Sequence, residues 1–188
     1  MRAHLLEGAR GLYNANMTPA AELIYSHDYA QRLYSGAAPF SEAWQDLIYR
    51  GEVFERVFHE AITPILTILP TVTGYDWART ELPIYLSASG ANLVRPLTLR
   101  ASDDVEEMLY DLILLLARVN IQTGFTTDEQ RDLVLRLVAK TTAERAGFDL
   151  ADAIAADELR IREQYGMAIQ PLPWDLDTQN IRAYLEEE

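Results

Sequence analysis

The sequence predicts a mainly α-helical protein: a compact bundle of about six helices around one buried central helix, with one β-hairpin and an extended C-terminal arm. Two observations predict this class. Apolar residues recur at the spacing of a single helix face through most of the chain. Residues 102–120 (SDDVEEMLYDLILLLARVN) are apolar around almost the whole circumference of such a helix, which is typical of a helix buried on most sides.

The central segment is too short in its charge-free part to span a membrane. Asp111 and Arg118 bracket that part, whereas a span needs roughly 20 mostly apolar residues. Asp103, followed by Glu106 three positions later, resembles a capping box at a helix start. We therefore expect a buried helix that begins beside Asp103, and no membrane partner.

Two helices are predicted at the start of the chain. Residues 2–13 form a weak amphipathic helix, because two glycines lower its stability. Thr18 and Pro19 are a strong start signal for the next helix, since threonine caps helices and proline suits the first helical position. This second helix is expected to run to about Tyr34, which places His27 on its apolar face.

A long amphipathic helix begins at Ser41. Its apolar stripe continues past Pro64, but proline has no backbone N–H to donate to the preceding turn. We expect a kink or an end near residues 61–63, and Pro70 is expected to end whatever helix follows.

Residues 81–100 have the composition of a β-hairpin. Residues 81–88 and 92–100 are predicted to be its two strands, joined by a turn at Ser89, Gly90 and Ala91. Two strands alone are only marginally stable in water. The hairpin is therefore expected to lean on the helices or to pair with another subunit.

The C-terminal half adds two helices and an arm. Residues 127–146 and the segment from Asp149 to Tyr165 are predicted helices, and we assign residues 1–166 to one domain. Residues 167–188 are predicted to form a docked arm with a short helix. Its extended part carries the candidate interaction residues, which are Pro171, Pro173 and Trp174.

Composition narrows the classes of partner. The formal net charge is −13, so the surface is expected to repel nucleic-acid phosphates and anionic membranes, and to attract basic partners or divalent cations. The chain contains no cysteine, which removes disulfides and thiolate chemistry. That fits a reducing compartment, and we expect a cytoplasmic location.

The best sequence candidate for chemistry is a metal site. Glu55 and His59 are four positions apart and therefore neighbours on one helix face, at the margin of the apolar stripe. His27 and Asp28 form a second pair. Carboxylates and imidazoles together are common ligands of divalent metals. An ordinary solvated charge pair is the competing interpretation. A zinc-peptidase HExxH motif fails, because Thr63 stands at the second histidine position.

The order of His4, His27-Asp28, His59 and Asp111 resembles that of HD-domain phosphohydrolases, which are all-helical metal enzymes acting on phosphoesters. The resemblance implies a metal-dependent site formed by these residues. After His27-Asp28, however, the chain reads YAQRLY instead of the small, glycine-containing continuation of such families.

Two hypotheses on function follow. The first is a non-catalytic assembly or protein-interaction protein, a homo-oligomer or the binder of a protein partner, with no cofactor expected. The alternative is a divalent-metal-dependent hydrolase with a His/carboxylate site between the helices starting at Pro19 and Ser41. The separation of His27 from Glu55 and His59 distinguishes the two hypotheses.

Overall fold

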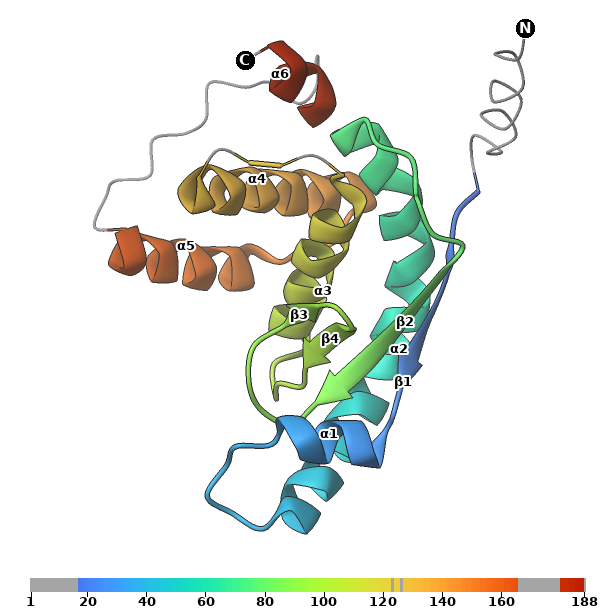
Figure 1. The fold of residues 1–188 in the computed structure, drawn as a ribbon, viewed down its shortest axis with the longest axis vertical. Coiled ribbons are helices and arrows are strands. Elements are labelled where there is room, and N and C mark those ends of the chain that lie inside the picture. Colours follow the sequence, from blue (N-terminus) through green and yellow to red (C-terminus); the bar gives the residue numbers. More distant parts are fainter. Residues whose placement is uncertain (1–16, 123, 126, 166–179, 188) are drawn as a thin grey trace, which may run out of the picture.

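The computed structural model describes residues 17–122, 124–125, 127–165 and 180–187, which form six helices and a four-stranded mixed sheet that packs against some of them (Figure 1). The strong helical content is confirmed, but the predicted bundle with a lone hairpin is corrected to an arrangement of helices on a sheet. In chain order the elements are β1 (Ala20–Ile24), α1 (His27–Leu33), α2 (Phe40–Thr73), β2 (Glu81–Ser87), β3 (Leu93–Val94), β4 (Leu97–Arg100), α3 (Val105–Asn120), α4 (Asp128–Ala146), α5 (Ala151–Tyr165) and α6 (Ile181–Glu187).

The predicted central helix is confirmed as α3. It packs against α2, α4, α5 and β4, and side chains such as Leu112 and Leu116 are completely buried. Its N-cap is Asp104, whose Oδ1 accepts the N–H groups of Glu106 and Glu107 at 2.9 and 3.1 Å. The cap therefore lies one position later than predicted. Asp103 instead pairs with Arg50 on α2, at 2.8 Å.

The helix predicted to start at Pro19 is wrong in its first half. Residues 20–24 form β1, which runs parallel to β2, and α1 begins only at His27 with Ser26 as its N-cap. Proline suits the first position of an edge strand as well as that of a helix, since neither position uses its missing N–H. The choice depends on β2, a partner about sixty residues away that no local pattern reveals.

The hairpin predicted over residues 81–100 is also wrong in topology. β2 and β4 pair in parallel, with Ser87 opposite Arg100, and the short β3 pairs antiparallel on the far side of β4. The Ala101 N–H donates to the Ser87 carbonyl at 2.9 Å. Every second residue of β2, counted back from Ser87, therefore directs its backbone N–H and C=O toward β4. Pro83 belongs to this set but lies beyond the start of β4, where no bond requires its missing N–H.

The helix that begins near Ser41 continues through both of its prolines. α2 extends to Thr73 and ends at Gly74, which adopts the left-handed conformation with φ 77°. Pro70 cannot donate to the Leu66 carbonyl one turn earlier. The indole N–H of Trp77 donates to that carbonyl instead, at 2.8 Å. Because α2 runs unbroken to Thr73, the end predicted near residues 61–63 does not occur. The Trp77 bond shows that the loop after α2 folds back onto the helix.

The C-terminal elements follow the predicted order. α4 ends at Ala146, with Gly147 in the left-handed conformation at φ 77°. α6 docks on the end of α2, where Ile181 is fully buried. The predicted helix over residues 2–13 and the interaction residues Pro171, Pro173 and Trp174 lie outside the described residues. No helix in the described part of the chain is long and apolar enough to cross a membrane.

The bond from Trp77 to the α2 backbone gives a test of this folded-back loop. We expect Trp77→Phe to lower the free energy of unfolding by about 1–3 kcal/mol, because the Leu66 carbonyl loses its donor. In a Pro70→Ala background, the new N–H of residue 70 can take that role, so Trp77→Phe should cost less there. Urea unfolding of the four proteins measures the coupling. An equal cost in both backgrounds would contradict the assignment.

Candidate functional site

The predicted metal ligands do not converge. His27 begins α1 and its ring contacts those of Phe40 and Trp44, with centroids 5.1 Å away in each case. Trp44 and His59 are 15 positions apart on α2 (59 − 44), which is roughly 22 Å at the rise of an α-helix. His27 therefore lies far along α2 from Glu55 and His59.

Each predicted pair also has a local arrangement of its own. The His59 Nδ1 atom is 2.7 Å from the backbone carbonyl of Glu55, one turn earlier, and His59 is exposed. His27 and Asp28 lie 3.6 Å apart, with side chains 54% and 89% exposed. Within the described ranges, no group of three or more histidine and acidic side chains could hold a metal ion. His4 lies outside the described residues.

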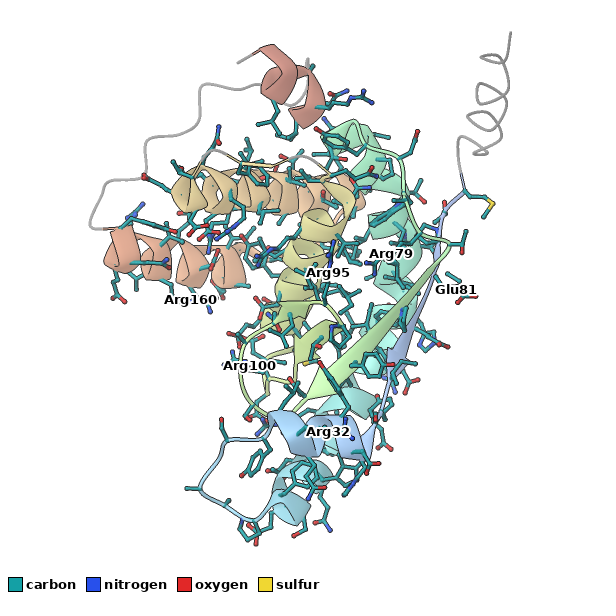
Figure 2. The ribbon with its side chains drawn as sticks, viewed as in Figure 1. Arg32, Arg79, Glu81, Arg95, Arg100 and Arg160 are labelled. Atoms are coloured by element: carbon teal, nitrogen blue, oxygen red, sulfur yellow. The ribbon has the colours of Figure 1, made fainter. Side chains whose placement is uncertain are left out.

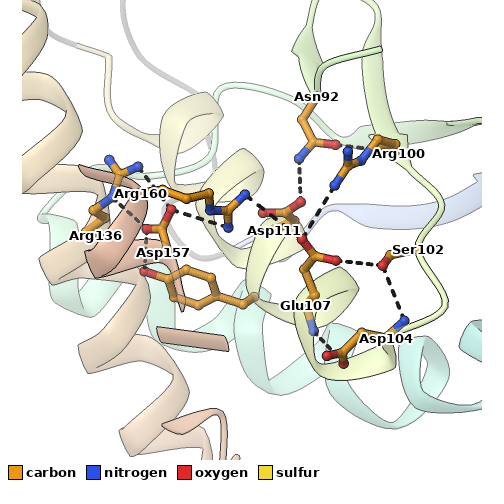
Figure 3. A network of polar contacts seen from close by, with 10 residues as sticks. Asn92, Arg100, Ser102, Asp104, Glu107, Asp111, Arg136, Asp157 and Arg160 are labelled. Atoms are coloured by element: carbon orange, nitrogen blue, oxygen red, sulfur yellow. Dashed lines mark hydrogen bonds and ion pairs between the residues drawn. The ribbon is translucent and has the colours of Figure 1, made fainter. Parts of the chain in front are cut away.

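Asp111, the fifth residue of the HD-like order, is buried on α3 in a polar network (Figure 3). Its Oδ2 accepts a hydrogen bond at 2.8 Å from the side-chain amide of Asn92. The Asn92 Oδ1 in turn accepts the backbone N–H of Arg100 at 2.7 Å. One turn earlier, Glu107 accepts the hydroxyl of Ser102 at 2.6 Å and pairs with Arg100 at 3.4 Å. These contacts tie the loops around β3 and β4 to α3.

A second buried carboxylate extends the network toward the C-terminus. Asp157 of α5 has a side chain only 5% exposed and lies 2.6 Å from Nε of Arg136 on α4. The hydroxyl of Tyr110 on α3 donates to it at 3.4 Å, and Arg160 pairs with it at 3.5 Å. The network therefore joins three helices, and its acids have partners within the protein. We interpret it as a structural network.

The network makes a prediction about pH. Burial raises the pKa of Asp111 above its ordinary value of 3.8, and the hydrogen bond from Asn92 opposes that rise. The folded state thus binds this proton more tightly than the unfolded chain, so Asp111 makes the protein less stable as pH rises through the raised pKa. Asp111→Asn cannot ionise. Its stability relative to the native protein should increase from pH 4 to pH 7 in urea unfolding. A difference independent of pH would contradict this.

A different part of the surface contains a pocket of about 320 Å³. Three segments line it: the loop between α2 and β2, the turn between β3 and β4, and the C-terminal end of α3. Each segment contributes one exposed arginine, and these are Arg79, Arg95 and Arg118. Figure 2 labels Arg79 on the first segment and Arg95 on the second. We call this the arginine pocket.

Side-chain bonds from the end of α3 hold the first wall of the arginine pocket in place. Asn120 donates to the Tyr75 carbonyl at 3.0 Å, and Gln122 donates to the Asp76 carbonyl at 2.7 Å. The hydroxyl of Thr73 also donates to the Asn120 side chain, which is buried. These bonds fix the loop that carries Trp77 and Arg79 against the helix that carries Arg118.

The charges of the arginine pocket are unbalanced. Among the described residues, Arg79, Arg95 and Arg118 form no hydrogen bond or ion pair, although the chain has 29 acidic residues to offer. Other arginines of the same protein pair with carboxylates, as Arg50 and Arg136 do. The position of Arg118 in the last turn of α3 is favoured by the helix dipole, but no such reason applies to Arg79 and Arg95.

Three guanidinium groups that have no partner in the described part of the chain lie at one pocket and can bind an anion. Each presents a planar fork of N–H donors that matches a carboxylate or a phosphate, and neighbouring like charges repel until an anion neutralises them. Sequence reasoning missed these residues, because they are isolated arginines on separate segments and form no motif. Comparison of the chain with protein-family models, curated proteins and solved structures found no match.

Proposed function

We propose that this chain is a binding protein for a small anionic molecule that carries phosphate or carboxylate groups. The observation that carries the proposal is that three arginines without a partner among the described residues line one pocket of an otherwise acidic protein. The pocket volume of about 320 Å³ lies at the lower end of the range for small-molecule sites.

The remaining walls of the arginine pocket narrow the choice of ligand. Trp77, Val94 and Ile121 supply apolar surface beside the guanidinium groups. Such a mixed lining suits a ligand with an apolar part next to its charged end, since the arginines orient the anion and the apolar walls bury the rest. The first hypothesis from the sequence, a non-catalytic assembly or protein-interaction protein, likewise involves no catalytic step, but the ligand proposed here is a small molecule. The metal-dependent hydrolase receives no support from the separated positions of His27 and His59.

Calorimetric titration with pyrophosphate and with citrate, at low ionic strength, tests the proposal. We expect saturable binding that Arg79→Ala and Arg95→Ala each weaken about tenfold, corresponding to ~1.4 kcal/mol, because each removes a charged donor. Added salt should weaken binding further by screening the exposed charges.

Arg32→Ala is the matched control, because Arg32 is an exposed arginine on α1, well away from Arg79 and Arg95 in Figure 2. It should leave binding unchanged. Absence of saturable binding, or an equal loss in all three variants, would contradict a specific site and indicate only general attraction of anions to arginine.

A further inference from the structure

Among the described residues, β1 forms an edge of the sheet with no further strand beside it. The strand order is β1-β2-β4-β3, so β1 is an outer strand, and Figure 1 shows it along one side of the molecule. The N–H of Ala20 donates to the Thr80 carbonyl at 2.9 Å. Because bonding alternates along a parallel pair, Glu22 also faces β2, whereas Ala21 and Leu23 direct both their N–H and C=O groups outward.

The outward N–H and C=O groups of Ala21 and Leu23 are fixed in position and available for hydrogen bonding. The side chains of Ala21 and Leu23 pack against the hydrophobic core, so the strand itself is fixed. Within the described residues, their outward backbone groups have no hydrogen-bond partner. An edge strand of this kind is a template for one more strand from another chain.

Two carboxylates lie beside this edge, on the exposed face of the sheet. In the β1–β2 register, Ala20 lies opposite Glu81 and Glu22 opposite Pro83, which places the two exposed glutamates diagonally on one face of the sheet. Figure 2 labels Glu81 beside the edge. None of the acids at the edge forms an ion pair within the described part of the chain.

Beyond the end of β1, two further acids come from α2. Burial, followed by the negative charges of Glu55 and Glu52, raises the pKa of Tyr25 to about 12, so both carboxylates lie near the residue that follows the strand. Acidic side chains therefore lie both beside β1 and beyond its C-terminal end.

A second copy of the chain fits this edge poorly. Two β1 strands related by a two-fold axis through their centres would place Glu22 opposite its own copy, and like charges directly opposite each other destabilise a strand pair. The net charge of −13 on each copy adds to the repulsion. The charge complement of the edge is a basic segment of another protein.

We propose that the edge of β1 binds an extended, basic segment of a partner protein as a fifth strand of the sheet. The backbone groups of Ala21 and Leu23 supply the hydrogen bonds, and Glu22 and Glu81 select a lysine or arginine at alternate positions of the partner. This inference is independent of the arginine pocket and gives the predicted protein interaction a surface and a chemistry.

Fluorescence anisotropy with a labelled peptide of alternating arginine and valine, of about eight residues, tests the proposal. Binding to the full chain is expected to be saturable, and a matched peptide of alternating glutamate and valine should not bind. Ala21→Pro removes an outward N–H without removing a bond to β2, so it should weaken binding at least tenfold. Ala21→Ser retains the N–H and should bind as the native protein does.

Glu22→Gln combined with Glu81→Gln should weaken binding of the basic peptide and flatten its dependence on salt, while leaving the fold intact. Circular dichroism checks the fold of each variant. Native binding by a folded Ala21→Pro protein would overturn the proposal.

Amide hydrogen exchange keeps the test decisive if the proline variant does not fold. In the native protein, the basic peptide should slow exchange at Ala21 and Leu23, and unchanged exchange at both would overturn the proposal. Light scattering tests the remaining alternative, a dimer formed through this edge. A dimer that Ala21→Pro dissociates would assign the edge to a second copy and would also overturn the proposal.

Discussion

The burial of α3 is the constraint on which the rest of the structure depends. A helix that is apolar on nearly all sides must be covered on nearly all sides, and α2, α4, α5 and β4 provide that cover. Covering such a helix also buries its few polar side chains. Tyr110, Asp111 and Asn120 therefore need partners from other segments, since an unpaired buried polar group costs about 1–3 kcal/mol.

These partners organise the irregular parts of the chain. Asp111 accepts a hydrogen bond from the Asn92 side chain. Asn92 in turn accepts one from the backbone N–H of Arg100 at the end of β4. Tyr110 meets Asp157 and thereby positions α5. Asn120 fixes the loop after α2. Each bond joins α3 to a segment distant in sequence, so the loops that form the arginine pocket are positioned by the polar residues of the most apolar helix.

The two proposed binding surfaces have opposite charge and arise from different causes. The arginine pocket collects three cations because the end of α3, the turn after β3 and the loop before β2 meet there. The edge of β1 is acidic because the sheet register places Glu22 and Glu81 on one face. The chain has a net charge of −13, so the positive charge of the pocket is opposite in sign to that of the whole protein, whereas the acidic edge has the same sign. A small anion and a basic strand would therefore bind without competing for the same surface.

The sequence by itself determined the elements whose signal is local: the buried helix α3, α4 with Gly147 at its end, α5, and the predominance of helix. It misassigned β1 and the order of the sheet, because Pro19 suits a strand as well as a helix and only pairing with β2 decides between them. It also suggested a metal site from His27 and His59, which share a residue type but not a location. The tertiary structure alone brought Arg79, Arg95 and Arg118 to one pocket, since spacing within one element says nothing about which loops meet in space.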